Sequence, residues 1–97
     1  MITTKERATL RSFSNNIPDL VYVGKDGVSD NVVKQVEDNL LAHELIKIKV
    51  QSNCSLSARE VCDQLVAVTN AQPISVVGGK IVLYKYTSKK GFKHYLG

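Results

Sequence analysis

The 97-residue sequence lacks long apolar runs and contains few cysteines. No apolar stretch approaches the ~20 residues of a membrane-spanning helix, and the polar opening MITTKERATL has no apolar signal-peptide core. The two cysteines, Cys54 and Cys62, are too few for a disulfide scaffold, and both histidines lie far from them, so zinc-site spacing is absent. We therefore expect a cytoplasmic protein in a reducing compartment, with no membrane association, no metal and no cofactor.

Acidic residues are also missing from the last third of the chain. Residues 1–63 contain eight Lys or Arg and nine Asp or Glu, whereas residues 64–97 contain five lysines and no acid. The net charge of +4 is therefore concentrated toward the C-terminus, and this distribution favours nucleic acid as a partner. A basic tail that only keeps the protein in solution would have the same composition, so charge alone leaves both interpretations open.

Hydrophobic patterns predict one domain with the element order α-β-α-β-α-β-β. The composition, 43% hydrophobic and 23% charged, fits a single globular core. Capping boxes begin helices at Thr3 and Ser57, and Ser29 is a good N-cap for a helix that runs to about Glu44. Strands are predicted over residues 20–23, which we expect to be buried, and over residues 45–50, 74–77 and 81–86.

This order predicts an α/β (α+β) fold with helices packed on a four-stranded mixed sheet, because strands separated by helices require right-handed crossovers. The Gly78-Gly79 pair predicts an antiparallel hairpin at the end. The expected buried stripes are Ala8, Leu10, Phe13 and Ile17 in the first helix, Val32, Val33, Val36, Leu40 and Leu41 in the second, and Val61, Leu65 and Val68 in the third. We assign residues 1–87 to the domain and residues 88–97 to a mobile, basic tail.

The segment YVGKDGVSD joins the first predicted strand to the second helix, with Gly24 and Gly27 on either side of Lys25 and Asp26. Glycine at such a junction lets a sugar-phosphate backbone approach closely, and the helix N-terminus attracts phosphate. The KH module clamps single-stranded nucleic acid with a GxxG loop of this kind. A tight strand-to-helix turn explains the same residues, so the loop alone leaves a KH-like clamp and a plain turn open.

Other basic residues fall on faces that the pattern predicts to be exposed. Lys47 and Lys49 alternate with inward-facing apolar residues of one strand, and Arg7 and Arg11 share one stripe of the first helix. These residues could form one basic surface with Lys25, or they could simply be solvated. The sequence does not show whether these faces adjoin.

No set of residues resembles a catalytic site. His43 falls near a helix C-terminus, where an imidazolium interacts favourably with the helix dipole. Cys62 lies near the buried stripe of the third helix, where a free cysteine behaves as a small apolar residue. We therefore expect that the protein is not an enzyme.

Four segments together resemble the CRM domain (chloroplast RNA splicing and ribosome maturation), in its stand-alone bacterial YhbY-like form. These segments are ITTKERATLRS, VYVGKDGVSDNVV, VEDNLLAHELIKIKV and ISVVGGKIVLYK, and the resemblance covers about residues 2–87. The piece HELIKIKV after an amphipathic helix is specific, whereas the loop alone is not. The resemblance implies the same element order, similar to the C-terminal domain of translation initiation factor three.

The resemblance also implies RNA binding without catalysis, through association with precursors of the large ribosomal subunit. It places the family's GxxG loop at residues 24–27 and a later family glycine at Gly78. The chain departs from the family pattern at two positions. Gly79 stands where a basic residue commonly follows that glycine, and Lys85 replaces the usual arginine and its planar fork.

We predict a monomeric RNA-binding domain that recognises structured ribosomal RNA, as precursor RNA or in pre-50S particles, through the GxxG loop and a basic surface. The alternative is a protein–protein interaction module with an incidental basic tail. The candidate RNA-binding residues are Gly24, Lys25, Asp26, Gly27, Arg7, Arg11, Lys47, Lys49, Lys80, Lys85, Lys89 and Lys90.

Overall fold

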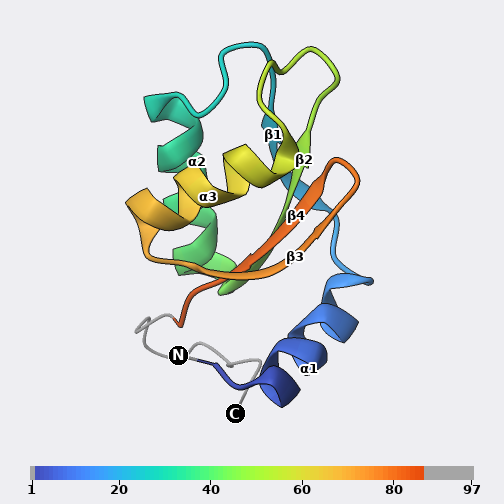
Figure 1. Ribbon diagram of the computed structural model, residues 1–97. Coiled ribbons are helices and arrows are strands. Elements are labelled where there is room, and N and C mark those ends of the chain that lie inside the picture. The colour runs from blue at the N-terminus through green and yellow to red at the C-terminus, as the bar shows by residue number, and fades with distance from the viewer. Residues whose placement is uncertain (1, 87–97) are drawn as a thin grey trace.

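The computed structural model describes residues 2–86 and has the predicted order of three helices and four strands (Figure 1). The helices are α1 (Thr4–Ser14), α2 (Asp30–His43) and α3 (Ala58–Thr69), and the strands are β1 (Asp19–Val23), β2 (Leu45–Val50), β3 (Gln72–Val77) and β4 (Lys80–Tyr84). The predicted α+β fold is thus confirmed. The predicted tail, residues 88–97, lies outside the described residues.

Each helix begins where the sequence places an N-cap. Thr3 and Ser57 form complete capping boxes with Glu6 and Glu60, in which side-chain and backbone groups exchange hydrogen bonds of 2.9–3.1 Å. Before α2, the Ser29 hydroxyl accepts an amide N–H of the first turn at 3.2 Å. These bonds satisfy amide donors that the first turn of a helix leaves without a partner, so the helix starts are encoded locally.

The strands form one sheet in the order β1-β2-β4-β3. β1 and β2 are parallel, and β4 runs antiparallel to both of its neighbours, β2 and β3. The C-terminal ends of β1, β2 and β3 therefore meet at one end of the sheet. We call it the loop end, because it carries residues 24–29, residues 51–57 and the Gly78-Gly79 turn. In Figure 1 the first two loops are at the top and the orange turn between β3 and β4 lies below them on the right.

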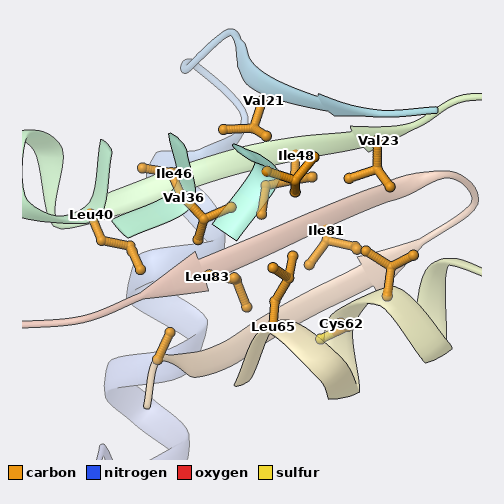
Figure 2. Close-up of a cluster of buried hydrophobic side chains, with 13 residues drawn as sticks. Val21, Val23, Val36, Leu40, Ile46, Ile48, Cys62, Leu65, Ile81 and Leu83 are labelled. Carbon is orange, nitrogen blue, oxygen red and sulfur yellow. The ribbon is translucent and has the colours of Figure 1, made fainter. Parts of the chain in front are cut away.

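The main hydrophobic core lies between the sheet and helices α2 and α3. It contains thirteen buried residues. Val21, Ile48 and Ile81 of the strands lie against Val36 and Leu65 of the helices (Figure 2). All five are 0% exposed. This side of the sheet therefore contributes most of the hydrophobic stabilisation.

Helix α1 covers part of the opposite face of the sheet. The core on this side is a cluster of five buried residues, Leu10, Leu45, Ile74, Val82 and Tyr84. Helix α1 contacts β2, β3 and β4, and it lies toward the end of the sheet far from the loop end (Figure 1). One helix cannot cover four strands, so this face is only partly closed.

Four residues that we assigned to buried stripes are instead exposed, namely Ala8, Phe13, Leu41 and Val68. Each helix meets the rest of the fold along a limited stripe, so residues at the margin of a predicted stripe stay outside. In α1 the buried residues are Leu10 and Ser14. In α3 they include Cys62 and Leu65 rather than Val68.

Candidate nucleic-acid interface

The GKDG segment forms a tight turn at the loop end. The Gly27 N–H donates to the Gly24 carbonyl at 3.0 Å, so the four residues close a β-turn with Lys25 and Asp26 at its exposed tip. Gly27 has a φ of 63°, a left-handed conformation in which a Cβ is costly. The turn itself therefore requires the second glycine.

The first glycine lies against a neighbouring loop. A Cβ on Gly24 would lie 3.0 Å from Gln51 Oε1 and 3.5 Å from Asn53 Oδ1, both in the loop after β2. The Gln51 N–H also donates to the Val23 carbonyl at 2.8 Å, which holds the two loops side by side. The turn thus explains Gly27 without a ligand, whereas Gly24 faces the flexible end of a side chain that can move aside.

The charges around this turn are of both signs. Lys25 is the one cation of residues 24–30, whereas Asp26 and Asp30 place two carboxylates near the start of α2. Ser29 already caps that helix. A phosphate would meet attraction and repulsion together here, so any contact at this turn depends on Lys25.

A stronger concentration of positive charge lies on the face of the sheet that α1 partly covers. Arg11 of α1, Lys47 of β2 and Lys80 of β4 line one hollow of about 270 Å³. Arg7 and Arg11 line a second hollow of about 430 Å³ along β3, which Arg59 of α3 also borders. The fold therefore brings cations from helices and strands onto one surface.

Strand register adds Lys49 to the same surface. Lys49 pairs with Tyr22 on β1 and with Lys80 on β4, and Lys80 pairs with Val77 on β3. Paired residues direct their side chains to the same face of a sheet, so this row crosses all four strands. We call the five cationic residues on this side the basic face: Arg7, Arg11, Lys47, Lys49 and Lys80.

Asp19, at the start of β1, introduces one acid into this surface. Its Oδ2 lies 2.9 Å from Lys80 Nζ in an ion pair, and its side chain is 14% exposed against 47% for Lys80. Asp19 Oδ1 is buried and has no hydrogen-bond partner within residues 2–86. The ion pair ties β1 to β4 across β2 and neutralises part of the charge of the basic face.

Sequence reasoning did not identify Asp19 or Tyr22 as site residues. Tyr22 was expected in a buried strand, but its side chain is 52% exposed. The alternation of Val21, Tyr22 and Val23 was the available signal, because successive strand residues point to opposite faces. No comparable signal pointed to Asp19, whose partner lies 61 residues later.

Lys85 lies at the other end of the sheet from the GKDG turn. Its backbone N–H donates to the Glu44 carbonyl at 2.9 Å, and its Nζ donates to the Thr69 carbonyl at 2.8 Å. An ammonium at the carboxyl end of a helix stabilises the helix dipole, so Lys85 has a structural role beside α3. The structure separates Lys85 from the basic face, and Lys89 and Lys90 lie outside the described residues.

The family model of the CRS1 / YhbY (CRM) domain matches residues 2–85. The chain belongs to this family. The resemblance predicted over about residues 2–87 is therefore confirmed.

This CRM domain is similar to proteins of two bacteria and an archaeon. It is 40% identical over 85 residues, 88% of each chain, to "Probable RNA-binding protein YqeI" of Bacillus subtilis. It is 34% identical over 97 residues to "Probable RNA-binding protein MJ0652" of Methanocaldococcus jannaschii, covering 98% of this chain and 70% of the relative. A hypothetical protein of Staphylococcus aureus has a solution structure with a TM-score of 0.78 and 33% identity, covering 93% of this chain and 94% of the other.

The described part of the CRM domain has no cluster suited to a metal ion. Within residues 2–86, no group of three or more His, Cys, Asp or Glu side chains is placed to hold one. Over the same residues, no helix has the length and apolarity to cross a membrane. Burial raises the pKa of the Cys62 thiol and the charge of Asp63 raises it further, which disfavours the reactive thiolate.

Proposed function

We propose that this CRM domain binds RNA, and that its ligand is structured precursor RNA of the large ribosomal subunit, met in the cytoplasm on pre-50S particles. The observation that carries the proposal is the convergence of Arg11, Lys47 and Lys80, from three separate elements, on one hollow. The names of the Bacillus and Methanocaldococcus relatives support the same class of ligand.

A surface of this kind suits a phosphate backbone. Lysine and arginine side chains that neutralise phosphates release condensed counterions, which supplies affinity without reading the base sequence. Double-stranded RNA is recognised mostly by its shape and by contacts to phosphates and 2′-hydroxyls. Arg11 adds an exposed planar fork that can bind phosphate through two parallel hydrogen bonds, whereas the Nε of Arg7 is buried. Binding of this kind requires no cofactor and no chemical step.

The salt dependence of binding tests the proposal. We expect the logarithm of the association constant for precursor ribosomal RNA to fall linearly with the logarithm of salt concentration. The slope should be about −3 to −5 if roughly 4–6 phosphates are neutralised. An RNA duplex of unrelated sequence measures the nonspecific part. A flat response to salt would reject RNA binding and favour the protein–protein interaction module.

The ribosomal part of the proposal needs a separate measurement. The protein, isolated from cells at low salt, should enrich precursor large-subunit RNA over mature large-subunit RNA and over unrelated transcripts. A variant that carries Arg11→Gln and Lys47→Gln is the control, because it should lose this enrichment together with its phosphate contacts. Equal recovery of all three RNA classes would show that the ligand is RNA but not an assembly precursor.

A further inference from the structure

Tyr22 links the GKDG turn to the basic face. It lies two residues before Gly24, about 7 Å along an extended strand, and it pairs with Lys49 on β2. Its side chain is 52% exposed, whereas Val21 and Val23 on either side are fully buried in the main core. Because both neighbours are fixed in the core, the strand holds the aromatic ring on the opposite, open side of the sheet.

The surface around this ring is open and cationic. The cluster of five buried residues beneath α1 includes Val82 and Tyr84 of β4. The next β4 residue on that face, toward the loop end, is Lys80, which pairs with Lys49. The Lys80 side chain is 47% exposed, and Val77 at the far end of the row is 72% exposed. An exposed aromatic ring beside cations is the arrangement on which nucleic-acid bases stack while their phosphates are neutralised.

We propose that Tyr22 is a stacking platform for one unpaired nucleobase of the RNA. The inference rests on the proposed RNA binding. It specifies that the loop end binds a single-stranded RNA segment, which runs from the GKDG turn toward Lys49. A base inside a duplex has both of its faces covered by neighbouring bases, so only a loop, bulge or chain end can present one to the ring. Lys49, beside Tyr22 in the register, neutralises a phosphate adjacent to the stacked base.

The acid on this face does not oppose such a ligand. Asp19 is already paired with Lys80 at 2.9 Å, so an incoming phosphate meets a compensated pair of charges. Lys49 and Lys47 stand on the strand between the two partners. The local charge near Tyr22 therefore stays positive.

Binding of two RNAs to four variants tests the inference. The RNAs are a single-stranded oligoribonucleotide and a fully paired duplex of equal length. The variants are Tyr22→Ala, Tyr22→Leu, Tyr22→Phe and, as a matched control, Tyr86→Ala, which alters a tyrosine that is 64% exposed beyond the opposite end of β4.

We expect Tyr22→Ala and Tyr22→Leu to bind the single strand roughly 5- to 150-fold more weakly, which is the range for the loss of one stacked base. Tyr22→Phe keeps the aromatic face, so it should bind within about twofold of the unaltered chain, as should the Tyr86→Ala control. Duplex affinity and the salt slope should change little in all four variants, because no phosphate contact is removed. Thermal unfolding should also change little, because Tyr22 is exposed.

Three results would overturn the stacking inference and leave the proposed RNA binding intact. The first is an unchanged single-strand affinity in Tyr22→Ala and Tyr22→Leu. The second is an equal loss for the single strand and the duplex, and the third is a loss in Tyr22→Phe as large as in Tyr22→Ala, which would indicate a hydroxyl contact. A lack of salt-dependent binding of either RNA by the unaltered chain would overturn the proposed function itself.

Discussion

The two faces of the sheet share four strands but are covered differently. On one face, α2 and α3 close a core of thirteen buried residues, whereas on the other α1 closes a cluster of five. Strand β2 supplies Ile46 and Ile48 to the first face and Lys47 and Lys49 to the second. This six-residue strand thus contributes Ile46 and Ile48 to the main core, and on the other face it contributes Leu45 to the smaller cluster and two lysines to the proposed RNA contacts.

This division separates the effect of a mutation on folding from its effect on binding. A truncation on the α2–α3 face removes buried apolar area and therefore lowers the free energy of unfolding. A substitution on the open half of the other face removes little buried area, so it should act mainly on the affinity for RNA. Residues on a packed strand are also held in position better than residues on a loop.

The largest expected effect lies on the α2–α3 face. Leu65→Ala truncates a fully buried side chain and should lower the free energy of unfolding by about 2–5 kcal/mol, as measured by urea denaturation. Val68→Ala on the same helix, at a position 53% exposed, is the matched control and should change it by less than about 0.5 kcal/mol. If both variants lost the same free energy of unfolding, α3 would not pack against the sheet through the side that carries Leu65.

The next effect concerns the basic face. A variant with Arg11→Gln and Lys47→Gln should bind RNA roughly 25-fold more weakly at about 0.15 M salt, because each phosphate contact contributes roughly fivefold there. Its salt slope should become shallower by about 2. Filter binding or fluorescence anisotropy across a salt series measures both quantities, while the free energy of unfolding should stay nearly constant.

Lys34→Gln is the control for that variant. Lys34 is an exposed cation of α2, 3.8 Å from Asp38, and it belongs to the helix layer on the other side of the sheet. Its neutralisation lowers the net charge without touching the basic face. If Lys34→Gln weakened RNA binding as much as Lys47→Gln alone, then net charge rather than the basic face would govern affinity.

Most of the fold could be predicted because its signals are local. The capping boxes at Thr3 and Ser57 fix helix starts through residues three positions apart, and the alternation of LIKIKV predicts β2 directly. The rotation of the helices could not be predicted with the same success. Phe13 and Val68 fit an apolar stripe by spacing, but the packing of each helix leaves them outside.

The candidate site could be predicted only in part. Each cation was predicted to be exposed, but Arg7, Lys47 and Lys49 are half-buried. The grouping of Arg11 with Lys47 and Lys80 depends on how α1 docks against the sheet, which no local pattern specifies. Lys85 illustrates the same limit, because its partner Thr69 belongs to another element. For the two glycines of the turn, the sequence left a clamp and a plain turn open, and their nearest contacts lie within the chain itself.

The two glycines of the GKDG turn lie at the loop end, where both faces of the sheet meet. Substituting each glycine by alanine shows how much the fold depends on it. Gly27→Ala places a Cβ at a φ of 63° and 3.4 Å from Leu56 Cδ1, and it should destabilise the fold by about 1–2 kcal/mol. Gly24→Ala meets only the flexible end of Gln51 at 3.0 Å, so it should cost less than Gly27→Ala. Thermal denaturation compares the two, and an unchanged stability in Gly27→Ala would show that the turn does not need glycine.

The smallest effect expected is at the tip of this turn. Lys25→Ala removes one exposed cation and should weaken RNA binding by at most about fivefold at about 0.15 M salt, the value of a single phosphate contact. Lys25→Asp should weaken it further, because a repulsive carboxylate replaces the lost attraction. Both variants keep Gly24 and Gly27, so the free energy of unfolding should change by less than about 0.5 kcal/mol.

Asp26→Asn supplies the opposite change at the neighbouring position of the same turn. It removes a carboxylate from the exposed tip. If phosphate approaches there, RNA affinity should therefore rise, by at most about fivefold, which is the value of one charge contact. Opposite shifts in Lys25→Ala and Asp26→Asn would place RNA at the turn as well as on the basic face. If neither variant changed affinity while Arg11→Gln with Lys47→Gln did, the GKDG segment would serve only to connect β1 to α2, and all of the binding would belong to the face that α1 leaves partly open.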